Sequence, residues 1–309
     1  ILKDFIIKSK TISGFDAPYV PGWDCHGLPI ELVVEKEHGK NIDPNKFRKL
    51  CREYALIQVE KQKKDFKRLG VLGDWDNPYL TINFETEANI VRALAKIYDK
   101  GFLYQGNKPV HWCTDCASAL AEAEVEYEDK PSPAIDVEFD CVNTKDIENI
   151  FGIKDVSKAS AIIWTTTPWT LPANEAISVN PKFQYGLYKC KNNFFILAEE
   201  LADIRFKVYE LPGIKVATCK GSDLEGVLFS HPFLDKSVPI ICGNHVTTET
   251  GTGLVHTAPA YGLDDYIVGM NYSLPVENPV DAKGKFKNDI LFFSGLTVWE
   301  ANPKVIEIL

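Results

Sequence analysis

The spacing of apolar residues predicts a long helix in the first part of the chain. Asp43 followed by Pro44 is a strong helix start, because Asp caps the first turn and Pro is favoured at the first helical position. Beyond this start, apolar residues recur at helical spacing at Phe47, Leu50, Cys51, Tyr54 and Ile57. The pattern predicts a helix that ends near Gly70.

Three further segments of this part read as helical. An apolar stripe predicts a helix from about Glu85 to Asp99, which Gly101 ends. The segment LPIELVVEKEHG (28–39) is amphipathic, and the chain opens within what reads as a helix. Between the long helix and the Glu85 helix, the residues VLGDWDNPYLT (71–81) are typical of a loop.

The pattern changes after Gly101. The runs LYQGNKPVHW (103–112) and ALAEAEVEYED (119–129) look extended, and a Cys-Thr-Asp-Cys turn joins them. The residues Asp129 to Pro133 read as a linker, because they hold two prolines within five positions. We therefore expect one domain in residues 1–130 and a second in residues 131–309.

The second part of the chain, from Ala134 on, has the β-propensity of strands. Short β-rich runs are separated by Gly, Pro, Asn and Asp, which favour turns. The runs are IDVEFDC, SAIIWTTT, YGLYKC, FFILAEE, IKVATCK, VPIICG and GLVHTA. We expect this part to be mainly β, in a barrel, with a helix beginning at Asp264-Asp265.

Composition is that of an ordinary globular protein and excludes long disordered tracts. Of 309 residues, 45% are hydrophobic and 25% are charged. No apolar run approaches the roughly 20 residues of a membrane span, and no signal peptide is visible. The chain begins Ile1-Leu2-Lys3 and holds a single methionine, Met270, so we expect it to be a piece of a longer protein.

The net charge bears on nucleic-acid binding, and the cysteine content bears on the redox state of the thiols. A net charge of -9 argues against indiscriminate binding to nucleic-acid phosphates. The basic run QKKDFKRLG (62–70) is typical of the solvated face of a helix. Only two of the eight cysteines, Cys113 and Cys116, have a chemically informative spacing, so we expect reduced thiols in the cytoplasm.

The segment GWDCHGLPIE (Gly22 to Glu31) combines a turn with reactive side chains. Its simplest interpretation is a buried Trp23 beside an Asp24 that caps the next helix. The adjacent Cys25 and His26 suggest a thiol nucleophile and its base, but neighbouring side chains usually diverge and no third group orients them.

The pair Cys113 and Cys116 has the two-residue gap of a zinc knuckle. A structural zinc site normally takes four protein ligands, and two are missing here, because His111 is too close in sequence to be a convincing third. The pair is therefore half of a zinc site or two inert, partly buried thiols.

Two further motifs are weak signals when taken one at a time. WTTTPWTLPAN (Trp164 to Asn174) begins like a strand whose threonines form a polar edge. GTGLVHTAP (Gly251 to Pro259) places a histidine within an extended run, where half-buried histidines are common, and Asp264-Asp265 is a good helix cap.

Together, and in this order, the three motifs GWDCHGLPIE, WTTTPWTLPAN and GTGLVHTAP resemble the class I aminoacyl-tRNA synthetases, in their isoleucyl form. GVLGDWDNPYLT (70–81) and KPVHWC (108–113) add to the resemblance. It implies an α/β chain: part of a Rossmann-type catalytic domain, followed by an inserted, mainly β-barrel editing domain that is truncated at its end.

The resemblance also implies roles for individual residues. Asp24 would meet the substrate ammonium group, while Trp23 and the backbone of Pro21 and Gly22 would shape an apolar pocket. His26 and Trp169 are two more residues expected to bind substrate. The residues expected to form the editing site, where a misattached valine is hydrolysed from tRNA, are Thr165, Thr166, Thr167, Asn174, His256 and Asp265.

In such a site Asp265 would hold the ammonium group of the valine, and the threonines with His256 would form the pocket wall. The segment PAYG (259–262) departs from relatives that carry Gly and His there, so Tyr261 has no assigned role. We see no convincing nucleophile triad, and therefore expect attack by water.

The same resemblance implies cofactors and partners for the parent enzyme. These are ATP and Mg²⁺, tRNA that accepts isoleucine, isoleucine itself and misactivated valine, with no membrane and a monomeric state. The HIGH and KMSKS signatures are absent, and we expect them before Ile1 and after Leu309, with a second cysteine pair for Zn²⁺ also after Leu309. Two alternatives stay open: a non-catalytic tRNA-binding module, and a valyl or leucyl synthetase.

Overall fold

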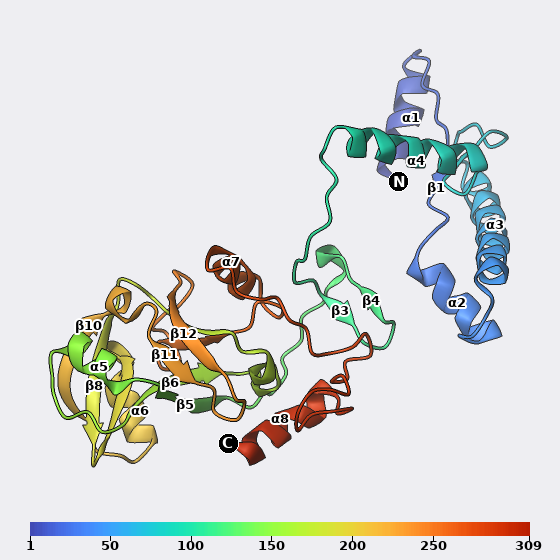
Figure 1. The fold of residues 1–309 in the computed structure, drawn as a ribbon. Coiled ribbons are helices and arrows are strands. Elements are labelled where there is room, and N and C mark those ends of the chain that lie inside the picture. The colour runs from blue at the N-terminus through green and yellow to red at the C-terminus, as the bar shows by residue number, and fades with distance from the viewer. The chain divides into compact units, whose positions relative to one another are not determined.

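The computed structural model describes all residues, 1–309, and the chain divides into two compact units (Figure 1). Unit 1 comprises Ile1–Gln105 and unit 2 comprises Gly106–Leu309. The Cys-x-x-Cys segment thus belongs to the second compact unit. The domain boundary expected near residue 130 concerns the family's domains and stays a prediction.

Unit 1 is helical around one small parallel sheet. Its elements are α1 (Leu2–Ile12), β1 (Gly22–Trp23), α2 (Leu28–His38), α3 (Pro44–Arg68), β2 (Tyr79–Leu80) and α4 (Phe84–Asp99). The side chain of Asp43 accepts the backbone N–H groups of Asn45 and Lys46, both at 3.0 Å. The predicted start of the long helix is therefore confirmed.

The core of unit 1 is small. Its buried cluster consists of Cys25, Ala55, Val59 and Ile82. Neither α1 nor α4 buries a residue, so the apolar stripe that predicted α4 faces outward in this chain. The helix itself lies where the pattern predicted it. The spacing of apolar residues indicates a helical conformation, but it does not identify the surface against which the apolar face packs.

Unit 2 begins with a short hairpin. Its strands are β3 (Trp112–Cys113) and β4 (Ser118–Ala119), and a 3₁₀ turn, η1, follows at Glu122–Glu124. The longer extended runs expected on both sides of the Cys-x-x-Cys turn are not strands. Apart from Trp112 and Ala119, which pair in the hairpin, their residues have no partner strand, and extended backbone outside a sheet leaves its N–H and C=O groups to water.

Most of unit 2 is a closed six-stranded barrel, as predicted. Its strands are β5 (Ile135–Cys141), β6 (Ala159–Thr165), β7 (Ala176–Val179), β11 (Leu228–Ser230), β12 (Ser237–Cys242) and β13 (Leu254–Thr257). They pair in the order β6-β13-β7-β12-β11-β5, and β5 pairs back onto β6 to close the ring. Closure removes the free sheet edges that would otherwise pair with another chain.

Two strands, β9 and β13, pair with the same edge of β6 at different positions along its length. The start of β6 pairs in parallel with β9 (Asn193–Ala198), and its end pairs with β13 through Trp164 and Val255. From β9 the sheet continues to β8 (Gln184–Cys190) and β10 (Ile214–Lys220). Thr165, the last residue of β6, therefore lies where the barrel and this extension separate.

Unit 2 also contains four helices (Figure 1). They are α5 (Thr144–Phe151), α6 (Glu199–Val208), α7 (Leu263–Asn271) and α8 (Val298–Ile308), with 3₁₀ turns η2 (Pro168–Ala173) and η3 (Gly221–Leu224). Of the four helices only α7 was predicted. No helix of the chain has both the length and the apolar character needed to cross a lipid bilayer.

The main core lies inside unit 2. Phe139, Ile163, Leu187, Ile196 and Phe229 are completely buried within one cluster. Burial of each such side chain contributes about 1.5–3 kcal/mol relative to exposure. This rigid core fixes the strand ends that carry the candidate site.

Candidate functional site

The end of β6, the turn η2, strand β13 and the first turn of α7 enclose a cavity of about 200 Å³. We call it the threonine cavity. Its lining residues are Trp164, Thr165, Thr166, Thr167, Thr170, Val255, His256, Ala258, Tyr261 and Asp265. Segments that are about 90 residues apart along the chain therefore meet here, because β6 and β13 are neighbours in the barrel.

Hydrogen bonds hold the threonines in one geometry. The Thr165 hydroxyl accepts the backbone N–H of Thr167 at 3.1 Å. The hydroxyl of Thr170 donates to the carbonyl oxygen of Thr167 at 2.8 Å, and the two hydroxyl oxygens of these residues lie 3.4 Å apart. Thr166 and Thr167 remain exposed, so their hydroxyls face any ligand in the cavity.

His256 is buried, and both of its ring nitrogens have partners. The amide Nδ2 of Asn174 donates to Ala176 O at 2.9 Å and lies 3.0 Å from His256 Nδ1, so Nδ1 accepts. The proton therefore sits on Nε2, which donates to the Thr170 hydroxyl at 2.7 Å. Burial, followed by the nearby His231 and Lys236, lowers the pKa of His256 to about 3.

These contacts give His256 a definite character. At neutral pH its ring is uncharged and has no free nitrogen for proton transfer. A general base needs a free lone pair within reach of the proton that it takes. The geometry thus supports a role in which His256 shapes the wall and orients Thr170.

Asp265 brings a carboxylate into the same cavity from the first turn of α7. Its Oδ2 accepts the backbone N–H of Ala258 at 2.9 Å. Burial raises the pKa of the Asp265 carboxyl, and the Ala258 hydrogen bond and the neighbouring His245 oppose that rise. The N-cap of α7 is Gly262, so Asp264 and Asp265 do not cap the helix as expected; they lie within its first turn.

The structure brings most of the predicted editing residues together. Thr165, Thr166, Thr167, His256 and Asp265 line one cavity. Asn174 does not line it, since it is completely buried behind His256 and acts through that ring. Residue roles remain predictions at this stage, but the proximity of the side chains is a property of the fold.

Trp169 lies elsewhere. It lines a second, larger cavity of unit 2, and its ring meets that of Tyr261 edge-on with the centroids 4.8 Å apart. Sequence reasoning also missed Thr170, which stands three residues after the threonine run. The 3₁₀ turn η2 returns Thr170 to the cavity, and a proline at the first position of that turn was the available signal.

In unit 1, part of the segment expected to bind an amino acid borders a cavity of about 250 Å³ between the turn after β1 and α3. Trp23 and Asp24 line it, and Trp23 Nε1 donates to Gln62 Oε1 at 3.0 Å. Gln62 is thus a lining residue that sequence reasoning missed. Asp24 is exposed, and the Thr81 hydroxyl lies 3.4 Å from its Oδ1.

Pro21, Gly22 and His26 do not line this cavity. Pro21 O accepts the backbone N–H of Tyr79 at 2.8 Å, and Gly22 pairs with Tyr79 in the parallel sheet. Their backbone therefore positions Trp23. His26 lines a neighbouring cavity of about 200 Å³, on which the buried Cys25 also borders.

The two cysteines of the predicted zinc knuckle lie in the β3–β4 turn. The backbone N–H of Cys116 donates to Cys113 Sγ at 3.4 Å, and this hydrogen bond lowers the pKa of the Cys113 thiol. A thiol with a lowered pKa is a suitable metal ligand. However, no group of three or more His, Cys, Asp or Glu side chains in this chain is arranged to hold a metal, so only half of a tetrahedral site is present.

Comparison with known proteins shows the family to which the chain belongs. The sequence model of the class I tRNA synthetases for isoleucine, leucine, methionine and valine matches residues 1–223. The chain therefore belongs to this family of class I synthetases.

Isoleucine–tRNA ligases are similar to the chain along its whole length. It is 57% identical over 315 residues to the ligase of Nitrosomonas europaea and 59% identical over 317 residues to that of Dechloromonas aromatica. The chain spans about a third, 34%, of the length of each ligase. The resemblance to the isoleucyl form is confirmed.

Among solved structures, the editing domain of the cytosolic leucyl-tRNA synthetase of P. knowlesi aligns with 46% of this chain and 64% of that one. Its TM-score is 0.38 and its sequence identity is 14%.

Proposed function

We propose that unit 2 hydrolyses the ester bond between valine and tRNA that accepts isoleucine, as the editing site of an isoleucyl-tRNA synthetase. One observation carries the proposal: a half-buried carboxylate, Asp265, lies in the same small cavity as four threonines and a neutral histidine. A carboxylate suits the ammonium group of an aminoacyl ester, and hydroxyls suit a water molecule and the ribose.

In this mechanism Asp265 pairs with the ammonium group and so fixes the position of the ester carbonyl. Thr166 and Thr167 hold the attacking water by their exposed hydroxyls. The bond from carbonyl carbon to ribose oxygen breaks, and the ribose oxygen takes up a proton as valine leaves. His256 has no free nitrogen, so it orients Thr170 and transfers no proton.

The same cavity would supply the second stage of selection. One methylene in a binding pocket gives only about 150-fold preference for isoleucine over valine, a value known for isoleucyl-tRNA synthetases themselves. A cavity that admits valine and excludes isoleucine would remove the valine that is still attached to the tRNA by mistake. Thr167 forms part of the wall, and a smaller residue there would enlarge the space and admit isoleucyl esters.

The test compares two adjacent aspartates in the full-length synthetase. Asp265→Asn should reduce the deacylation of valyl-tRNA by at least 100-fold, about 2.7 kcal/mol of lost ion pairing. Asp264→Asn is the matched control, because Asp264 lies in the same helical turn but is exposed and outside the cavity. Equal deacylation by both variants would contradict the proposal. No single-turnover deacylation even in the unaltered enzyme would favour a non-catalytic tRNA-binding module.

A second assay tests the size filter. Thr167→Ala should retain hydrolysis of valyl-tRNA and begin to hydrolyse isoleucyl-tRNA, because the added volume admits one more methylene. If the variant still spares isoleucyl-tRNA, Thr167 does not set the upper size limit.

We further propose that the whole protein attaches isoleucine to its tRNA in the cytoplasm, as a monomer, and uses ATP and Mg²⁺. The sequence identity of 57% with an isoleucine–tRNA ligase supports this proposal, as does the cavity in unit 1 that Asp24 lines. The Cys113–Cys116 pair fits half of a Zn²⁺ site, and two ligands from elsewhere in the protein would complete it. Asp24→Asn in the full-length enzyme should raise the KM for isoleucine in ATP–pyrophosphate exchange, and an unchanged KM would contradict the assignment.

A further inference from the structure

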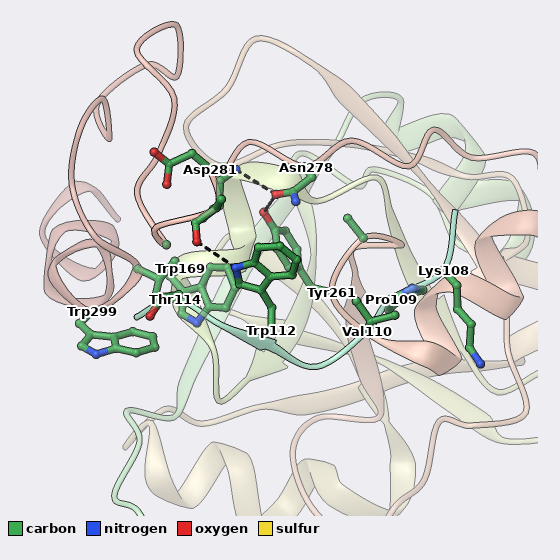
Figure 2. A pocket seen from close by; sticks show the side chains of 15 residues that line it. Lys108, Pro109, Val110, Trp112, Thr114, Trp169, Tyr261, Asn278, Asp281 and Trp299 are labelled. Carbon is green, nitrogen blue, oxygen red and sulfur yellow. Dashed lines mark hydrogen bonds between the residues drawn. The ribbon is translucent and has the colours of Figure 1, made fainter. Parts of the chain in front are cut away.

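A second cavity of unit 2 takes no part in the proposed hydrolysis. Its volume is about 490 Å³, more than twice that of the threonine cavity, and we call it the aromatic cavity (Figure 2). It lies between the segment 108–114, the start of η2, the residues 278–284 and the first turn of α8. Three tryptophans and a tyrosine line it: Trp112, Trp169, Trp299 and Tyr261.

These rings are held in place and yet present open surface. Trp112 Nε1 donates to Ala282 O at 2.9 Å, and the Tyr261 hydroxyl donates to Asn278 Oδ1 at 2.8 Å (Figure 2). Trp112 is nevertheless 44% exposed and Trp299 is 61% exposed. Rigid aromatic rings with open faces are suited to stacking against a flat ligand, because little side-chain entropy is lost on binding.

Two lysines lie at the cavity or its rings, although the chain as a whole carries a net charge of -9. Lys108 lines the cavity, and the Lys130 ammonium group lies 5.0 Å from the centre of the Trp299 ring. The backbone N–H groups of Lys285 and Lys283 lower the pKa of the Asp281 carboxyl, and the charges of the two lysines add to this effect.

Asp281 is the single carboxylate among the lining residues. Its Oδ1 accepts the backbone N–H groups of Lys283 at 2.8 Å and Lys285 at 2.9 Å. This negative charge is therefore engaged by its own loop. The combination of fixed aromatic rings and lysines is the usual way in which proteins bind single-stranded nucleic acid.

Tyr261 connects the two cavities, because it lines both of them. The Trp169 ring, which lines the aromatic cavity, makes an edge-on contact with the ring of Tyr261. A ligand whose end occupies the threonine cavity would therefore have its adjoining part beside Tyr261, at the aromatic cavity.

We propose that the aromatic cavity binds a nucleobase of the single-stranded 3′ end of tRNA, from a nucleotide next to the one that carries the ester. The proposal rests on the proposed editing function, which supplies the position of the terminal nucleotide. The base stacks on Trp112 or Trp299, and the lysines contact the phosphates on either side of it.

The test uses the full-length synthetase and two substrates. One is tRNA charged with valine, and the other is adenosine esterified with valine at its ribose, which lacks all preceding nucleotides. Trp299→Ala should raise the KM for valyl-tRNA by roughly 5- to 150-fold, the range measured for loss of one stacked base, and leave the KM for the adenosine ester unchanged. The indole N–H of Trp299 has no hydrogen-bond partner in the fold, so this variant should fold normally.

Two further variants separate stacking from structural damage. Trp112→Phe keeps a ring but loses the bond to Ala282, and should retain more tRNA affinity than Trp112→Ala. Tyr127→Ala is the matched control, because Tyr127 is an aromatic residue of the same unit, 83% exposed and outside the cavity. Equal KM increases for both substrates, or equal effects of the Phe and Ala variants, would overturn the proposal.

A binding measurement keeps the two proposals distinguishable. If the unaltered enzyme hydrolyses neither substrate, the editing function fails, and titration with a short single-stranded RNA ending in CCA decides the second proposal. Quenching of tryptophan fluorescence that is lost in Trp299→Ala would support a nucleobase site. If the RNA does not quench the fluorescence, the proposal of a nucleobase site is overturned, and contact with protein becomes the favoured role of the cavity.

Discussion

Two buried histidines should make unit 2 sensitive to mild acid. His231 donates from Nε2 to Leu171 O at 3.0 Å, and its Nδ1 accepts the backbone N–H groups of Phe233 and Leu234. Burial lowers the pKa of His231 to about 4, while that of His256 is lowered to about 3. Both rings therefore stay neutral in the fold at pH values at which they take up a proton in the unfolded chain.

The sign and size of the effect follow from proton linkage. The folded-state pKa of each histidine is depressed, so its full contribution to stability is present above pH 6.5 and is lost as the pH falls from 6.5 towards the folded-state pKa. Between pH 7 and pH 5 each histidine should remove about 2 kcal/mol from the free energy of unfolding, and the pair about 4 kcal/mol. Domains are typically stable by only about 5–15 kcal/mol, so the loss is large.

The assay measures how much the free energy of unfolding changes between pH 7 and pH 5, and compares this change in the unaltered protein with that in a variant lacking one histidine. Urea unfolding at pH 7 and pH 5, read by hydrogen exchange of the amides in β6 to β8, reports unit 2 alone. His231→Asn lowers stability at both pH values, but it should shrink the change between them by about 2 kcal/mol. His111→Asn is the control, because His111 is an exposed histidine of the same unit.

The raised carboxyl pKa values of Glu138, Glu175 and Asp265 act in the opposite direction as the pH falls. They are common to all three proteins and cancel in the comparison. If His231→Asn shows the same loss between pH 7 and pH 5 as the unaltered protein, His231 titrates alike in both states and the reasoning is wrong.

Three other predictions concern unit 2. Gly221→Ala should destabilise the unit by about 1–3 kcal/mol or more in urea unfolding, because the added Cβ would overlap the backbone oxygen of Asn180; an unchanged midpoint would contradict this contact. Asn174→Asp removes the donor to His256 Nδ1, so ¹⁵N NMR of the ring should show the proton moved to Nδ1, with deacylation reduced at least tenfold; an unmoved proton would refute the assigned tautomer. Because burial raises the pKa of Asp265, the kcat/KM of deacylation should fall on the acid side at a pH above the ordinary aspartate value of about 3.9, and a normal value would exclude this carboxylate.

The sequence predicted the elements whose signal is local. The start of α3 follows from Asp43-Pro44, and the strands β5, β6, β8 and β10 follow from β-rich runs bounded by turn residues. Helices α5, α6 and α8 were missed, since each is short and depends on tertiary packing for much of its stability. Ile147 in α5 and Val305 in α8, for example, are completely buried against the main core.

Five residues of the threonine cavity were predictable because the family motif names them, but their connections were not; they are Thr165, Thr166, Thr167, His256 and Asp265. Nothing in the order of residues indicates that Asn174 reaches the cavity only through His256, or that Thr170 completes the chain of hydrogen bonds. Trp169 shows the limit most clearly. It belongs to the same motif as the threonines, yet the turn η2 directs its ring into the aromatic cavity.

The pairing of β6 with β13 bears on how the protein is made. The threonine run that begins at the end of β6 leaves the ribosome roughly 90 residues before His256, and at ordinary synthesis rates of about 5–20 residues per second this is an interval of several seconds or more. During that time β6 can pair with β5 and β9, which are nearer along the chain, but the edge beside Trp164 stays open. Hydrolytic competence should therefore arise in one late step of cotranslational folding, when β13 occupies that edge.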